Sequence, residues 1–101
     1  MNRKQIAIEF AKSLNSNEIE KIILFGSVAR GDDNNDSDID ILIITSDESN
    51  ISKEIYSKVS DFTLKTGEYL SVKIKTKSYY NSYKNKSLFF KNITNEGVII
   101  G

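Results

Sequence analysis

The hydrophobic positions near the N-terminus recur with the period of a helix. Ile6, Phe10 and Leu14 are spaced four residues apart among charged and polar neighbours. A helix places residues at this spacing on one face, so that the face can pack against a core. We therefore predict an amphipathic helix over residues 3–15.

Two apolar runs follow this helix, and each has the length of a strand. Residues 21–25 (KIILF) form a short run that a glycine ends, which predicts a buried strand. Residues 39–45 (IDILIIT) are apolar on both faces beyond Asp40, which is typical of a central strand. Between the two runs, residues 27–31 have the length of one helical turn, and residues 32–37 have the composition of a loop.

A second helix and a third strand are predicted after these runs. Residues 51–66 carry apolar side chains at helical spacing, and Gly67 is placed to end the helix. Residues 69–76 (YLSVKIKT) alternate between apolar and polar positions, which predicts a strand with one buried and one wetter face. The candidate N-caps of the helix are Ser49, Asn50 and Ser52.

The patterns near the C-terminus are shorter. Residues 77–86 are polar and rich in tyrosine, which permits a helix. A final helix is predicted around residues 88–93, closed near Gly97, and residues 98–100 could add an edge strand. The order of helices and strands is that of an α/β or α+β fold, with a small mixed sheet and flanking helices. The 101 residues fit one domain, 1–101.

Composition excludes several kinds of site. The sequence has no cysteine and no histidine, which excludes disulfides, thiolate zinc sites and the commonest general base. Any bound metal would have oxygen ligands, which favours a hard ion such as Mg²⁺ or Mn²⁺. The 14 basic and 14 acidic side chains balance, so a dedicated nucleic-acid binder is disfavoured. The N-terminus lacks the apolar core of a signal peptide, and no run approaches the ~20 residues of a membrane span. We therefore expect a cytoplasmic protein without membrane association.

The candidate chemistry lies in residues 26–43, GSVARGDDNNDSDIDILI. Asp38 and Asp40 are two residues apart where a strand is predicted to begin, so both carboxylates should share one face, with Cα atoms roughly 6.5–7 Å apart. Carboxylates placed together repel each other unless a cation joins them. Gly26 and Ser27 follow the preceding strand, at a junction where free N–H groups suit an anion.

Arg30 is on the same side of that turn and could contact a phosphate or brace the acidic loop. If the two strands are neighbours, a phosphate cradle faces two metal ligands, as nucleotidyl transfer requires. The alternative is a solvated turn with strand-end caps. An EF-hand fits poorly because the glycine and glutamate of its loop are missing, and no Gly-Lys-Ser/Thr of a P-loop follows Gly26.

The spacing of these residues resembles the signature of the minimal nucleotidyltransferases of the DNA polymerase beta superfamily. The resemblance implies that fold, with Gly26 and Ser27 at the nucleotide phosphates and with Asp38 and Asp40 as catalytic residues that bind the divalent metal. It implies transfer of a nucleoside monophosphate, usually AMP from ATP, to a hydroxyl with release of pyrophosphate. The residues that carry it read G-S-x-A-R-G and then S-D-x-D, with ten residues between Ser27 and Asp38.

One expected element of that signature is missing. The family generally has a third carboxylate on the strand after the next helix, and residues 69–76 contain no acid. By register Ser71 occupies that position, and Lys73 lies two residues further on. Glu68, just before the strand, is the nearest acid and could turn into the site, although a solvated strand-edge residue is its simpler interpretation.

Small proteins of this family often accompany a HEPN-domain protein as a toxin–antitoxin pair. The resemblance implies an antitoxin that silences its partner, an RNase, by attaching AMP to a tyrosine or by holding it in a complex. Two other functions stay open: a degenerate module that neutralises a partner by binding alone, and a small-molecule transferase that needs a second subunit or a homo-oligomeric cleft.

Several aromatic residues near the C-terminus also permit two interpretations. Tyr79, Tyr80 and Tyr83 lie among lysines and resemble a stacking surface for nucleic acid. We interpret them instead as half-buried aromatics or as part of a partner interface. Phe90 would mark an exposed apolar patch if it lay outside the core. The residues expected to serve in the core and in docking are Leu88, Phe89, Phe90 and Ile93.

Overall fold

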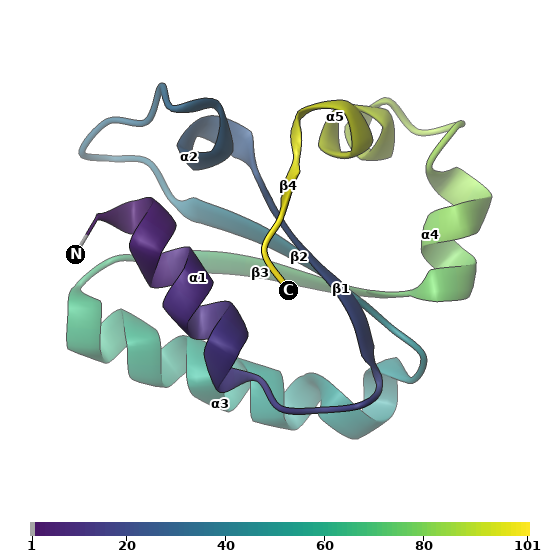
Figure 1. Ribbon diagram of the computed structural model, residues 1–101, viewed down its shortest axis with the longest axis horizontal. Helices are drawn as coiled ribbons and strands as arrows, with labels where there is room; N and C mark the ends of the chain where they lie inside the picture. The colour runs from purple at the N-terminus through teal and green to yellow at the C-terminus, as the bar shows by residue number, and fades with distance from the viewer. Residues whose placement is uncertain (1) are drawn as a thin grey trace.

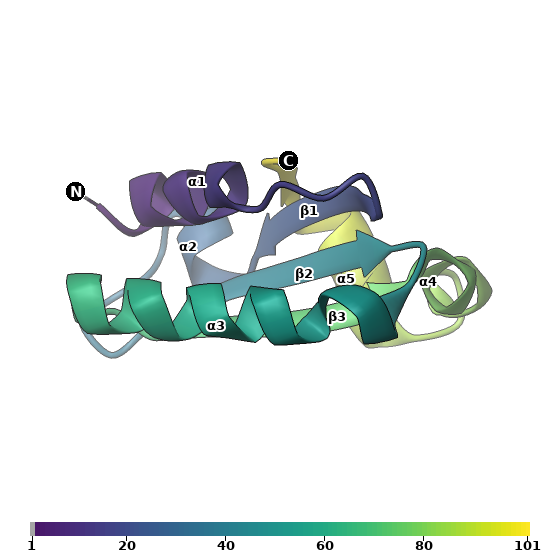
Figure 2. The ribbon, with the colours of Figure 1, turned by 90° about the horizontal axis from the view of Figure 1, so that it is seen from below.

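The computed structural model describes residues 2–101 and contains a mixed sheet with helices on both faces (Figure 1, Figure 2). The fold class therefore agrees with the prediction from the sequence. The elements, in chain order, are α1 (Arg3–Ser13), β1 (Ile19–Phe25), α2 (Gly26–Arg30), β2 (Ile39–Thr45), α3 (Glu48–Thr66), β3 (Leu70–Thr76), α4 (Lys77–Tyr83), α5 (Leu88–Glu96) and β4 (Val98–Ile99).

The strands pair in the order β3-β2-β1-β4. β1 is antiparallel to both β2 and β4, whereas β2 and β3 are parallel and are connected through α3. β2 is thus an inner strand, as its apolar residues on both faces predicted. The register places Phe25 opposite Asp40 and Asp40 opposite Ser71, so these three residues form one row across the sheet.

The larger core lies between the sheet and the helices α1 and α3. Ile6 and Phe10 of α1 are buried there, and the ring of Phe10 meets the ring of Phe62 edge-on at 5.6 Å. Side chains of a strand alternate between faces, so every second residue of β1, β2 and β3 enters this core. The strand residues buried in it are Ile22, Leu24, Ile39, Ile41, Ile43, Leu70 and Ile74.

The opposite face of the sheet is covered by α4 and α5, which contribute Tyr80, Phe90 and Ile93 to a smaller core. The sheet residues of this core are Ile23, Phe25, Leu42 and Ile44. Asp40 and Ser71 belong to the same face, because each is paired in register with a residue that points there. The polar part of the row therefore lies beside the helices α2 and α5 rather than under α1 and α3.

The sequence predicted one end of α3 correctly and missed the other. Gly67 ends α3 in the left-handed conformation with φ +73°, as predicted. The predicted start was wrong, because α3 begins at Glu48 and its N-cap is Asp47, which accepts a hydrogen bond from the Ser49 N–H at 3.1 Å. The first turn of α3 is polar and exposed, so hydrophobic spacing could not reveal it.

The C-terminal segments form the two helices and the short edge strand that the sequence suggested. Phe90 is buried, so it is not the marker of an exposed patch, and Tyr80 is buried beside it. Leu88 and Phe89 do not enter the core: they are 73% and 42% exposed. Within residues 2–101, no helix combines the length and apolarity that a membrane span requires.

We expect α5 to depend on one of its apolar residues far more than on another. Ile93→Ala removes a side chain that is only 2% exposed, and this should lower the free energy of unfolding by roughly 2–5 kcal/mol. Leu88→Ala, on the same helix, should change it by no more than about 0.5 kcal/mol. Urea unfolding followed by circular dichroism measures both values, and equal losses would contradict the described packing of α5.

Candidate active site

The junction between β1 and α2 lies directly against Asp40. Gly26 begins α2 with φ +74°, a conformation that residues with a Cβ rarely adopt. A Cβ at this position would lie 3.1 Å from Cγ of Asp40 and closer still to its Oδ2. The absence of a side chain therefore lets the backbone of the junction approach the carboxylate.

The first turn of α2 keeps backbone N–H groups available. Phe25 is its N-cap, and it provides no side-chain hydrogen bond to the helix. Ser27, half-buried in the second position of α2, accepts hydrogen bonds at its carbonyl from the N–H groups of Gly31 and Asp32, at 2.9 and 3.1 Å. The turn is thus closed at its C-terminal end, while its N-terminal end faces the Asp40 carboxylate.

The surroundings of Asp40 disfavour the charged form of its carboxyl group. Its pKa is raised above 3.8, first by burial and second by the negative charge of Asp38, while Lys73 and Arg30 act in the opposite direction. Asp38 itself is exposed, just before β2 begins. A cation bound between the two carboxylates would offset both the desolvation and the repulsion.

The chemistry of the two acids fits one hard divalent ion. Mg²⁺ prefers oxygen ligands and is usually held by one or two carboxylates together with phosphate groups of a substrate. Asp38 and Asp40 supply such carboxylates next to a junction suited to phosphate. Residues 2–101 contain no group of three acidic side chains that could enclose a metal by themselves. The arrangement therefore fits an ion that arrives with a nucleotide better than a protein-only cage.

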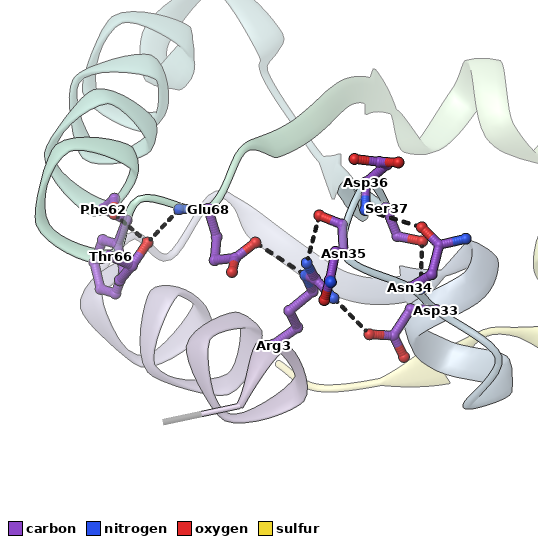
Figure 3. Close-up of polar contacts among 9 residues, drawn as sticks. All are labelled: Arg3, Asp33, Asn34, Asn35, Asp36, Ser37, Phe62, Thr66 and Glu68. Carbon is purple, nitrogen blue, oxygen red and sulfur yellow. Dashed lines mark hydrogen bonds and ion pairs between the residues drawn. The ribbon is translucent and has the colours of Figure 1, made fainter.

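In the register of β2 and β3, Ser71 lies opposite Asp40. This is the position at which the resemblance implied a third carboxylate. Glu68 does not replace it. The Glu68 carboxylate accepts a hydrogen bond from Arg3 Nε at 2.9 Å, so it is turned towards the start of α1 (Figure 3). The third acidic position of the candidate site is consequently filled by a hydroxyl group.

Arg3 also braces the loop that precedes the Asp pair, a role that the sequence did not reveal. Its guanidinium donates to Asp33 at 2.9 Å and to the carbonyl of Asn35 at 3.1 Å (Figure 3). Within the loop, the Asn34 N–H donates to the Ser37 hydroxyl at 2.9 Å. The sequence indicated only that an acid-rich loop needs a cation. It did not identify Arg3 as that cation, because Arg3 is far from the loop in sequence.

Arg30 contacts acids on both sides of it. Its guanidinium donates to Asp32 at 3.2 Å and to Glu96, at the end of α5, at 3.4 Å, so it braces the acidic loop as one of its two expected roles. A hollow of about 190 Å³ lies between α2 and α5 beside this pair. The hollow is lined by Phe25, Gly26, Arg30, Phe89, Asn92, Ile93 and Glu96.

The junction after β1 and the two acids at the start of β2 lie beside each other, an arrangement that fits nucleotidyl transfer. The family comparison agrees with this geometry, since residues 5–100 match the model of the nucleotidyltransferase domain. The chain therefore belongs to the nucleotidyltransferase domain family, and it is of the minimal type that its motif predicted.

Two curated relatives come from Methanocaldococcus jannaschii. MJ0604, named as a candidate protein adenylyltransferase, is 35% identical over 103 residues, which covers 99% of this chain and 99% of the relative. MJ0141, which carries the same name, is 30% identical over 99 residues, with 93% and 94% covered.

The fold is also shared with solved structures. A crystal structure of a toxin–antitoxin with AMP-PNP matches all of this chain and 73% of the other, with a TM-score of 0.62 at 20% identity. A mutant of the toxin–antitoxin MntA–HpeT matches with the same coverage, a TM-score of 0.61 and 18% identity. At these identities the two structures show a common fold.

Two glycines with the same backbone conformation should respond differently to alanine. Gly26→Ala and Gly31→Ala both force a Cβ into the left-handed region, and each should cost roughly 1–2 kcal/mol of stability. Only the Cβ at Gly26 would displace the Asp40 carboxylate, because the space at Gly31 is open. We expect Mn²⁺ to bind Gly26→Ala about 10–100-fold more weakly, with Gly31→Ala unchanged, by electron paramagnetic resonance titration. Equal Mn²⁺ affinities would contradict the contact.

The raised pKa of Asp40 predicts the direction in which the stability of the protein changes with pH. Its contribution to stability is complete below the ordinary value of 3.8 and is lost as the pH rises through the folded pKa. Asp40→Asn should therefore be more stable than the wild type at pH 7 in EDTA, by less than about 1 kcal/mol because the group is partly solvated. The difference should vanish near pH 3. Urea unfolding measures it, and a less stable variant at pH 7 would refute the cause given for the shift.

Proposed function

We propose that this chain transfers AMP from ATP to a hydroxyl group of a partner protein, with one Mg²⁺ or Mn²⁺ held by Asp38 and Asp40. The observation that supports this proposal is the close approach of the Gly26 backbone to Asp40, where an added Cβ would overlap the Oδ2 atom of the carboxylate. A phosphate bound at this junction would lie next to a metal ion held by the two acids. A solvated turn between two strands would need neither a glycine at φ +74° nor a half-buried acid beside it.

The chain's residues have separate parts in the proposed reaction. The N–H groups of Gly26 and Ser27 hold phosphate oxygens, and Arg30 adds positive charge beside them. The oxygen of the acceptor hydroxyl forms a bond to the α-phosphorus, and the bond from that phosphorus to the bridging oxygen breaks. Pyrophosphate leaves, and the hydroxyl proton passes to solvent. When bound, the divalent ion neutralises the charge that develops on the phosphate oxygens.

The acceptor in this proposal is a tyrosine of a HEPN-type toxin, and the chain is its antitoxin. The name of MJ0604 supports a protein acceptor, since that relative covers nearly the whole chain. The toxin–antitoxin crystallised with AMP-PNP supports the nucleotide and the biological setting, through a shared fold. These comparisons are the basis for preferring a protein acceptor to a small molecule.

A second function is favoured by one specific observation. Ser71 stands opposite Asp40, and the nearby Glu68 is paired with Arg3 rather than directed at the Asp pair. A site with two carboxylates in place of three could have lost catalysis while keeping the surface that binds a partner. In that case the chain would neutralise its partner by forming a complex alone.

Transfer of label distinguishes these two functions. Incubation with α-labelled ATP, Mg²⁺ and the partner encoded beside this chain should place label on the partner. Asp38→Asn should reduce the labelling at least a hundredfold (about 3 kcal/mol of lost charge stabilisation). Asp36→Asn removes an exposed acid of the same loop and serves as the matched control, with labelling unchanged.

Two outcomes would correct this proposal. A partner that stays unlabelled with Mg²⁺ and with Mn²⁺, yet binds the wild type and Asp38→Asn with the same affinity, supports the binding module and refutes the enzyme. Label that appears on the partner at a serine or threonine would keep the transfer reaction and correct the acceptor.

A further inference from the structure

β3 presents a lysine, rather than an acid, to the face that carries Asp40. Ser71 and Lys73 are successive residues on this face, because their in-register partners on β2 are Asp40 and Leu42. Lys73 is thus two residues along the strand from the position opposite Asp40. This side of the site carries a hydroxyl and a nearby positive charge.

The ammonium group of Lys73 lies over one aromatic ring, and among the described residues it has no acidic partner. Its Nζ lies 5.9 Å from the centroid of the Phe89 ring, within the range of a cation–π contact. Phe89 in turn meets Phe25 edge-on at 5.7 Å, and Phe25 is the residue before Gly26. Across residues 2–101, none of the ion pairs involves Lys73. Its charge is therefore free for an anion that enters from solvent.

Lys73 is also near Asp40 across the pairing of β2 with β3. Asp40 is in register with Ser71, and Lys73 is the next residue of β3 on the same face. Lys75, on the same face two residues further along β3, is in register with Ile44 and lies 4.7 Å from the centroid of the Tyr79 ring. The two lysines thus share a strand, a face and an aromatic contact, and they differ in their distance from the site.

We propose that Lys73 is a phosphate-binding residue of this site, which contacts an oxygen of the nucleotide triphosphate and takes the place of a second divalent ion. This inference rests on the proposed function, in that the anion is a nucleotide. A second ion would need carboxylates from both strands, and β3 offers none. A lysine is a fixed positive charge that balances phosphate without needing protein ligands. The chain would then work with one divalent ion.

Nucleotide binding provides the first test. Isothermal titration with AMP-PNP and Mg²⁺ should show about 10–100-fold weaker binding to Lys73→Gln, the loss expected for a charged hydrogen bond. Lys73→Arg keeps the charge and should bind within roughly threefold of the wild type. Lys75→Gln, the matched control, should stay within roughly twofold. Unchanged binding to Lys73→Gln, or an equal loss in Lys75→Gln, would overturn the inference.

The number of ions provides a second readout that does not depend on activity. Electron paramagnetic resonance of Mn²⁺ should count one bound ion for each nucleotide bound to the wild-type chain. Two ions per bound nucleotide would overturn the inference. Urea unfolding of Lys73→Gln should match the wild type, because an exposed lysine contributes little to stability.

The outcomes also separate this inference from the proposed function. A wild type that binds AMP-PNP through Lys73 but transfers no AMP supports the role of Lys73 and refutes the enzyme. A wild type that binds no AMP-PNP with Mg²⁺ refutes both.

Discussion

The site depends on one close approach, in which the backbone of Gly26 lies against the carboxylate of Asp40. Antiparallel pairing of β1 with β2 makes this approach possible, because the end of β1 is thereby placed beside the start of β2. A side chain at Gly26 would separate the two groups, and a different register would turn Asp40 into the apolar core under α1 and α3. The large core on that face therefore does more than stabilise the sheet, since it fixes which face the acid can occupy.

Three cationic side chains, on α1, α2 and β3, lie near Asp40 or the loop that precedes it. Arg30 and Arg3 are both paired with acids of the loop, whereas Lys73 lies over the ring of Phe89. The first two cations hold the loop in shape, and the third remains available to an anionic ligand. Although the whole chain has no net charge, its cationic residues thus have different roles around the site.

Much of the fold followed from patterns within short segments. The spacing of Ile6, Phe10 and Leu14 predicted α1, and the alternation of residues 69–76 predicted the two faces of β3, including the position of Ser71. Element boundaries were less accurate where the terminal residues are polar. β1 begins at Ile19, two residues before the apolar run, because Ile19 still pairs with Thr45 across an irregularity in the register at the exposed Glu20.

The candidate site shows the same division between local and distant information. Gly26, Ser27 and the Asp pair were recognisable because they lie within one continuous motif. The pairing of Arg3 with Asp33 and Glu68 was not, because such contacts join segments whose proximity only the folded chain creates. The sequence therefore indicated what chemistry the motif could perform, but it did not show which residues support the motif from outside.

The Arg3 contacts also constrain how this protein can vary. One guanidinium contacts Asp33 and the backbone of Asn35 in the loop and, on the other side, Glu68 just before β3. An inserted or deleted residue in the loop would move one of these groups out of its reach. In this chain, an arginine on another element thus limits the number of residues that can separate the glycine from the aspartates.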